Sequence, residues 1–267
     1  MVQRLFPLDF SNYSGWQWHL NNLQSNHTSK QIMNFNISAF THVGTVRESN
    51  QDNILVNGQL LNEGKVHLTE QDNCFCFVAD GVGGNKGGDF ASHFVLDKIK
   101  AEQEKLLIDA EQLLKSINNK LIEDTSNDNK LKGCCTTLTG LLVQNEFFKI
   151  IHAGDSEIWL MRNDMFFKIT NDQVLDEAVK NSSITSYFGG LDDYLKLDQN
   201  ISIHETLVGD IFLLCSDGLL KSLNQKIIKS ILKADKDLET KTNKILENCL
   251  QAGADDNTSV ILIQQTK

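Results

Sequence analysis

Residues 134–169 read CCTTLTGLLVQNEFFKIIHAGDSEIWLMRNDMFFKI, and they hold four apolar runs separated by short polar gaps. The runs are residues 134–143, 147–153, 157–162 and 165–169. Apolar runs of this length, bounded by Gly, Asn and Asp, are typical of β-strands. Connections this short fit antiparallel hairpins, because a parallel connection needs a crossover of a dozen or more residues. The stretch therefore predicts an antiparallel sheet.

Further strands and four helices are expected on either side of this stretch. The remaining strand-like runs are residues 37–45, 74–79, 211–215 and 259–263. One helix begins near Asp89, and a second places Ala110, Leu114, Ile117 and Leu121 on one apolar stripe. Two more are expected near the C-terminus, the last with Leu238, Thr242, Ile245 and Cys249 on one face and Gly253 as its cap. This order predicts an α+β domain with central antiparallel sheets and helices outside.

The first 36 residues differ in composition from the rest. They contain the only proline, Pro7, and two of the three tryptophans, Trp16 and Trp18, and no hydrophobic period stands out. We expect residues 1–36 to form an N-terminal leader or an arm packed on the domain, and residues 37–267 to form one catalytic domain.

Composition and charge exclude several classes of protein. The 267 residues are 40% hydrophobic and carry a formal net charge of −10, which argues against a nucleic-acid partner and an anionic membrane surface. No apolar run approaches the roughly 20 residues of a membrane helix, and no secretory signal is present, so we expect a cytoplasmic protein. None of the six cysteines has C-x-x-C spacing, so they are expected to be reduced core residues.

Four aspartates stand near the ends of predicted strands, and a fifth lies just before the short apolar run Ile54-Leu55-Val56. The four are Asp80, Asp155, Asp217 and Asp256, and the fifth is Asp52. A single Asp beside Gly is usually a turn residue. Five carboxylates at strand ends would repel one another if they converged, unless cations neutralised them. Oxygen ligands of this kind suit Mg²⁺ or Mn²⁺. Two such ions can activate a water and bind phosphate oxygens, and Arg47 offers a guanidinium that matches a phosphate.

A glycine-rich stretch follows the strand at residues 74–79. Residues 81–88 read GVGGNKGG, which matches neither a dinucleotide-binding loop nor a Walker loop. We interpret it as a tight loop that lets the backbone approach a metal ion.

Six segments together resemble the type 2C (PPM) family of metal-dependent protein serine/threonine phosphatases, in the family's order. They are residues 44–52 (GTVRESNQD), 78–84 (VADGVGG), 133–137 (GCCTT), 153–156 (AGDS), 214–219 (LCSDGL) and 256–259 (DNTS). The resemblance covers nearly everything after residue 37. It implies a four-layer α/β/β/α sandwich, in which two central antiparallel sheets are flanked by helices.

The resemblance also implies roles for individual residues. Asp80 would bridge two Mn²⁺ or Mg²⁺ ions, with the Gly81 carbonyl as a further ligand. Asp217 and Asp256 would hold one ion, and Asp155 with Asp217 would hold a third, weaker one. Arg47 would bind the phosphate, so that Arg47, Asp52 and Asp80 are the candidate catalytic residues.

Three departures from the family pattern bear on these roles. Gln51 stands where the family usually has an acidic ligand to the second ion, unless Asp52 substitutes for it. Val82 replaces a histidine that is a proposed general acid in some members, as in many bacterial relatives. The flap segment, residues 171–190, is short and carries Asn171-Asp172-Gln173 where D-H-S is common.

The leading hypothesis is a phosphatase that hydrolyses phosphoserine and phosphothreonine in proteins by attack of a metal-activated water. Its substrates would be phosphorylated by a serine/threonine kinase. One alternative is a pseudophosphatase, which binds a phosphoprotein without turning it over; Gln51, Val82 and the short flap motivate it. A two-metal nuclease is a third possibility, which the net charge disfavours.

Overall fold

The computed structural model describes residues 33–82, 87–144, 147–176, 183–191, 193–197 and 204–266. Residues Met33–Lys267 form one compact unit. Most of the expected N-terminal arm, residues 1–32, lies outside the described residues, as do residues 83–86 of the glycine-rich loop and residues 177–182 of the flap segment.

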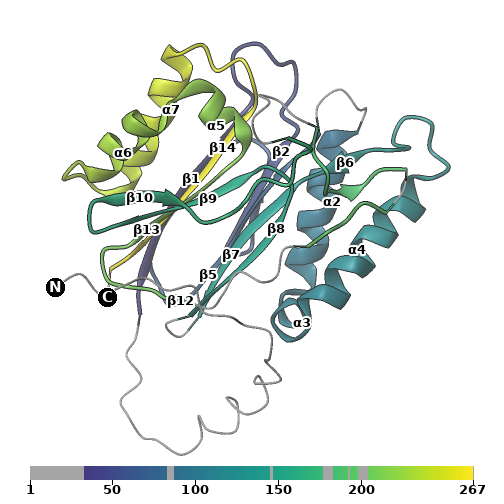
Figure 1. Cartoon of the computed structure of the whole chain (residues 1–267), viewed down its shortest axis with the longest axis horizontal. Helices are drawn as coiled ribbons and strands as arrows, with labels where there is room; N and C mark the ends of the chain where they lie inside the picture. Colours follow the sequence, from purple (N-terminus) through teal and green to yellow (C-terminus); the bar gives the residue numbers. More distant parts are fainter. Residues whose placement is uncertain are drawn as a thin grey trace, which may run out of the picture. The chain divides into compact units, whose positions relative to one another are not determined.

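Two six-stranded antiparallel sheets form the centre of this unit (Figure 1). The first has the order β10 (Met165–Lys168), β9 (Glu157–Arg162), β13 (Ile211–Cys215), β14 (Thr258–Gln265), β1 (Phe35–His42) and β4 (Gly64–Gln71). The second has the order β12 (His204–Glu205), β8 (Phe147–Ala153), β7 (Leu138–Gln144), β5 (Cys74–Asp80), β2 (Asp52–Val56) and β3 (Gln59–Leu61). A separate short pair joins β6 (Cys135–Thr136) and β11 (Phe188–Gly189).

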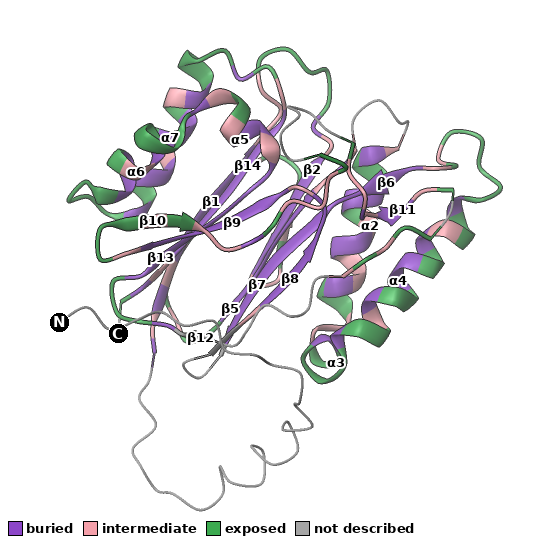
Figure 2. Ribbon diagram, in the orientation of Figure 1, coloured by how far each residue is buried: buried purple, intermediate pink, exposed green. Residues whose placement is uncertain are grey.

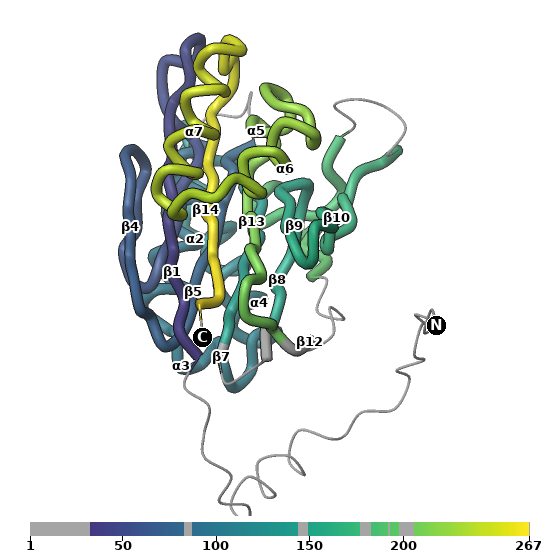
Figure 3. Tube along the Cα trace, turned by 90° about the vertical axis from the view of Figure 1, so that its left-hand side faces the viewer, coloured from purple at the N-terminus to yellow at the C-terminus, as the bar shows by residue number. Residues whose placement is uncertain are grey.

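Helices cover the outer face of each sheet, as Figures 1 and 3 show. The second sheet is covered by α2 (Gly88–Ala101), α3 (Gln103–Ile108) and α4 (Ala110–Thr125). The first is covered by α5 (Asp217–Ser222), α6 (Gln225–Lys233) and α7 (Leu238–Gln251). The α+β class and the four-layer sandwich are therefore confirmed.

Three apolar clusters correspond to the three contacts between these layers. One lies between the sheets and includes Ile37, Val78, Leu141 and Phe212. Each of the other two lies between one sheet and the helices that cover it. Figure 2 shows that the buried residues of these helices lie on the side that faces the sheet. The apolar stripe predicted for α4 is buried at all four positions, and so are the four residues predicted for one face of α7. All six cysteines are buried thiols outside any disulfide, as expected.

The sequence pattern missed or displaced several elements. The run at residues 134–143 is two strands, because the backbone N–H of Thr137 bonds to the carbonyl of Asp80 and leaves β6 to pair with β11. Strand β1 begins at Phe35 and ends at His42, earlier than predicted at both ends. The edge strands β3 and β4 were not predicted, because few of their side chains are buried and their apolar pattern is weak. In the described part of the chain, every helix is too short or too polar to cross a bilayer.

Candidate metal centre

Three of the five aspartates lie beside the ends of three neighbouring strands of the first sheet. Strands β9, β13 and β14 are neighbours, and Cys215 at the end of β13 pairs with Glu157 at the start of β9. Asp217 follows that end, Asp155 precedes that start, and Asp256 lies just before β14. The antiparallel register therefore brings together three residues that are far apart in the chain.

The other two aspartates face each other in the second sheet. Asp52 opens β2, Asp80 ends β5, and the two residues are direct partners in the antiparallel register. Side chains of such partners lie on the same face of a sheet, and like charges opposite one another are unfavourable. This pair is consequently an electrostatic cost of the fold unless protons or cations relieve it.

Two serines connect Asp52 to the first sheet. The hydroxyls of Ser216 and Ser259 donate to Asp52 Oδ2 at 2.7 and 2.8 Å. The other oxygen, Oδ1, is buried and has no hydrogen-bond partner among the described residues. Burial raises the pKa of Asp52 to about 6, and the charges of Asp217 and Asp256 add to this rise while the two serines oppose it. Asp52 is thus held in place at one oxygen and available at the other.

Asp80 interacts with all four of the other aspartates. Burial raises its pKa well above the usual range, and the negative charges of Asp52, Asp217, Asp155 and Asp256 raise it further. This mutual effect places the five carboxylates in one electrostatic cluster, which joins the ends of both sheets.

Asp155 and Asp217 also hold their protons more tightly than usual. Burial raises the pKa of Asp155 to about 7, with a further rise from the charge of Asp217. Burial likewise raises the pKa of Asp217, although the nearby Lys221 opposes that rise. Raised proton affinity at several acids in one cluster marks that cluster as a candidate functional site.

Two cationic side chains reach the cluster. Arg47 Nη2 lies 2.9 Å from Asp256 Oδ1. Lys221 Nζ lies 2.5 Å from Asp217 Oδ2 and 2.7 Å from Asp256 Oδ2. The predicted phosphate-binding arginine is therefore at the cluster, with a side chain that is 46% exposed and accessible from solvent.

Two glycines allow the backbone to approach closely around the cluster. A Cβ on Gly81 would collide with the backbone of Gly88 and of Gln51. A Cβ on Gly218 would collide with the carbonyl of Asn257, which follows Asp256. Both positions need glycine because of contact distance, and both bring chain segments together beside predicted ligands.

The predicted site residues are thus found together. A family model described as Protein phosphatase 2C matches residues 48–253, which is well over half of the chain. The chain belongs to the protein phosphatase 2C family. The resemblance inferred from the six sequence segments is confirmed.

Individual relatives of this phosphatase 2C chain are bacterial. It is 25% identical over 248 residues to the serine/threonine phosphatase stp of Listeria innocua, with 84% of this chain and 94% of the relative covered. It is 27% identical over 252 residues to the protein phosphatase PhpP of Streptococcus pneumoniae, with 86% and 98% covered. These relatives are named as phosphatases and lend no support to the pseudophosphatase alternative.

Solved structures share the fold. A serine/threonine phosphatase of S. agalactiae superposes with a TM-score of 0.73 at 22% identity, over 87% of this chain and all of the other (100%). The catalytic domain of a serine/threonine protein phosphatase PstP, solved in complex with two manganese ions, superposes with a TM-score of 0.71 at 23% identity, over 88% of this chain and 100% of the other.

The donors in this phosphatase 2C chain fit hard divalent cations in their chemistry. They are carboxylates with raised proton affinity, and one buried oxygen of Asp52 has no partner among the described residues. Within the described ranges, however, no group of three Asp, Glu, His or Cys side chains is arranged to hold a metal ion as it stands. Lys221 forms ion pairs with Asp217 and Asp256 instead, and Arg47 forms an ion pair with Asp256.

Four residues of the site were not singled out from the sequence. They are Ser216, Ser259, Lys221 and Asn257. The two serines and Asn257 lie inside the segments that resemble the family. Their hydrogen bonds to Asp52 and to Gln51, however, join segments far apart in the chain and depend on the tertiary fold. Lys221 had a local signal, because it stands four residues after Asp217; recognising α5 as a helix would have predicted that pair.

The base of the flap segment is joined to the cluster. The backbone N–H of Gln173 donates to the carbonyl of Gly154, and the side-chain oxygen of Gln173 accepts from the N–H of Gly154. Gln173, in the place of the common D-H-S pattern, therefore anchors the residue that precedes Asp155.

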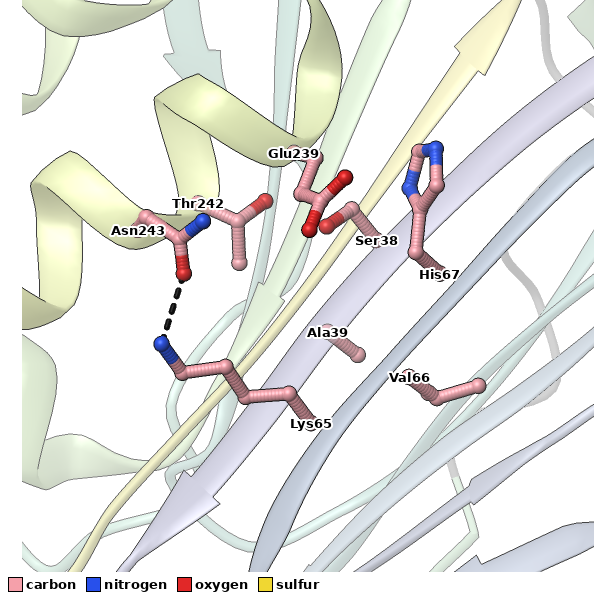
Figure 4. Close-up of a pocket in the computed structure, with 8 residues that line it drawn as sticks. All are labelled: Ser38, Ala39, Lys65, Val66, His67, Glu239, Thr242 and Asn243. Carbon is pink, nitrogen blue, oxygen red and sulfur yellow. Dashed lines mark hydrogen bonds between the residues drawn. The ribbon is translucent and has the colours of Figure 1, made fainter.

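A cavity of about 140 Å³ lies elsewhere, between α7 and the strands β1 and β4 (Figure 4). Its polar lining includes Lys65, His67 and Glu239, and Lys65 donates to Asn243 at 2.7 Å. Among the described residues, those that line it include none of the five aspartates. It is separate from the candidate metal centre.

Proposed function

We propose that this chain is a phosphatase that removes phosphate from serine and threonine side chains of proteins. One observation carries the proposal: five aspartates from both sheets form a single cluster with raised proton affinity, beside an accessible arginine. Membership of the phosphatase 2C family and the names of the bacterial relatives support it.

Two Mn²⁺ or Mg²⁺ ions are the cofactors that this cluster would take. Asp80 would contribute to both sites, with the Gly81 carbonyl as a further ligand. Asp217 and Asp256 would hold one ion, and Asp52 would supply its free oxygen. The PstP relative with two manganese ions supports this number. Asp155 with Asp217 is the candidate for a third, weaker site.

Bound dications would supply the positive charge that acidifies a water nucleophile and stabilises the phosphoryl oxygens. The residues of the chain would orient the reactants. Arg47 would turn from Asp256 to the substrate phosphate, which its planar guanidinium matches in two parallel hydrogen bonds. The serines at Asp52 would keep that carboxylate charged and fixed. With Val82 after Gly81, no side chain at that position can donate a proton to the leaving group.

The partners follow from this reaction. We propose phosphorylated proteins as substrates, modified by a serine/threonine kinase. Residues 37–267 would be the catalytic domain and residues 1–36 a leader or arm. A cytoplasmic location stays a prediction.

The decisive experiment measures hydrolysis of a phosphothreonine peptide with Mn²⁺, with EDTA, and by Asp80→Asn. Activity should require Mn²⁺ and should fall by at least about 100-fold in the variant, because a carboxylate that would contribute to both metal sites is lost. Asp97→Asn on α2, whose side chain is 51% exposed, is the matched control and should keep full activity. Activity that survives both EDTA and Asp80→Asn would reject the mechanism. Cleavage of DNA in the same conditions would favour the nuclease instead.

A further inference from the structure

Lys221 occupies a specific place within the acidic cluster. It lies one helical turn after Asp217 on α5, so its side chain returns along the helix to that residue. Its Nζ contacts Asp217 Oδ2 at 2.5 Å and Asp256 Oδ2 at 2.7 Å. The side chain is 31% exposed, so the ammonium stands at the border between the cluster and solvent.

The two oxygens bound by Lys221 belong to the residues that would together hold one dication. A dication such as Mg²⁺ in contact with both would need these oxygens at roughly 2.0–2.1 Å, closer than the ammonium stands. The lysine and the dication cannot occupy this position together, because they would overlap and repel. Arg47 already takes the other oxygen of Asp256. This arrangement agrees with the finding that no three acidic or metal-binding side chains of the described ranges are arranged to hold an ion.

We propose that Lys221 is a tethered counter-ion, which holds Asp217 and Asp256 together in the metal-free protein and which the dication must displace on binding. The inference rests on the proposed metal-dependent function and concerns one residue that this function does not use. It makes Lys221 a positioning residue that sets the affinity of the site for the metal.

The arrangement has two consequences of opposite sign. Without the lysine, the cluster loses one of the two cationic partners that it has among the described residues, so the metal-free protein should become less stable. The same loss leaves the carboxylates of Asp217 and Asp256 unoccupied and the site more negative, so Mn²⁺ should bind more tightly. A residue with a merely structural role would weaken both properties, and a metal ligand would also weaken binding when it is lost.

The test combines calorimetric titration with MnCl₂ and thermal unfolding in EDTA. Lys221→Gln and Lys221→Met remove the charge, Lys221→Arg keeps it, and Lys226→Gln on α6 is the matched control at an exposed lysine. Two charge-assisted hydrogen bonds are lost at a partly solvent-screened position, so we expect Mn²⁺ affinity to rise about tenfold in the neutral variants. Their melting temperature in EDTA should fall, whereas Lys221→Arg and Lys226→Gln should resemble the parent protein.

The outcomes separate this inference from the proposed function. Equal Mn²⁺ affinity in the parent and both neutral variants, or weaker binding in the variants, would overturn the role of Lys221 while leaving a metal-dependent phosphatase intact. Absence of Mn²⁺ binding in every folded variant would overturn both. Binding that appears only in the neutral variants would support the inference in its strongest form.

Discussion

The side-chain oxygen of Asn257 accepts a hydrogen bond from the backbone N–H of Gln51 at 2.9 Å. The amide nitrogen of the same side chain donates to the carbonyls of Val43 and Ser49 at 2.9 and 3.0 Å. One asparagine therefore fastens the loop that carries Arg47 to the start of β14. Asn257 follows Asp256, so the residue that fastens this loop is next to a carboxylate predicted to bind metal.

Asn257→Ala should disturb both stability and catalysis. Three hydrogen bonds are lost and their backbone partners are left unpaired, so we expect a loss of about 2–3 kcal/mol in the free energy of unfolding. The value of kcat/KM should fall at least about tenfold, because misplacing a phosphate-binding group raises the barrier. Denaturant unfolding and peptide hydrolysis measure the two effects. Asn243→Ala, which removes only an exposed bond from Lys65, is the control. Equal losses in both variants would contradict the role of Asn257.

Removing the hydroxyls of Ser216 and Ser259 should move the acid limb of the pH profile. Both donate to Asp52, whose pKa is about 6 because burial raises it more than these two hydrogen bonds lower it. In Ser216→Ala and Ser259→Ala the pKa of Asp52 should therefore rise, so activity and Mn²⁺ binding should need a higher pH than in the parent protein. The double variant should show the larger shift. An unchanged profile in the double variant would mean that Asp52 does not titrate in this range.

The fold could be predicted from the sequence where a long apolar run coincides with a buried strand. Residues 74–79 and 211–215 are apolar runs in buried central strands, and the α4 stripe faces its sheet, so local pattern and tertiary environment agree. Strand β4 is different: of its eight residues only Val66 is buried, and an edge strand with polar side chains resembles a loop. The small pair of β6 and β11 depends on a contact between distant segments, which no local pattern encodes.

The site was predicted as a set of acids but not as an arrangement. The aspartates are recognisable because each follows or precedes an apolar run and lies in a family segment. Their counter-ions and hydrogen-bond donors are ordinary Lys, Ser and Asn residues, whose roles arise only when the two sheets come together. Sequence reasoning therefore found the carboxylates and Arg47 and missed Lys221, Ser216, Ser259 and Asn257.

The metal-free protein should lose stability as pH rises. The pKa of Asp155 is about 7 in the folded chain against 3.8 for a free side chain, so the folded state keeps a proton that the unfolded state has released. The stability that this proton contributes is fully present below pH 3.8 and is lost as pH rises through about 7. Between these limits the free energy of unfolding should fall by at most about 1.4 kcal/mol per pH unit. Thermal unfolding in EDTA between these limits measures this slope.

Two comparisons isolate the contribution of Asp155. Asp155→Asn should flatten the decline in EDTA, while Asp97→Asn should leave it unchanged. In saturating Mn²⁺ the stability of the parent protein should instead rise with pH, since metal binding requires deprotonated carboxylates. A slope that is the same in Asp155→Asn and in the parent would show that Asp155 does not carry the effect.

Gly218→Ala should move Asp217 away from Asp256, the other residue predicted to bind the same ion. The added Cβ would meet the backbone carbonyl of Asn257, which cannot move without shifting the start of β14 or of α5. Overpacking against backbone costs typically 1–3 kcal/mol, and we expect about 3 kcal/mol or more here together with weaker Mn²⁺ binding. Gly253→Ala is the control, because nothing lies within 4 Å of its Cβ position and only the strain of a φ of +110° is added. Chemical denaturation gives the stabilities and calorimetry gives the metal affinity of each variant. The contradicting result is a Gly218→Ala variant that binds Mn²⁺ as tightly as Gly253→Ala. Metal binding by Asp217 and Asp256 would then not depend on the close approach between the start of α5 and the start of β14.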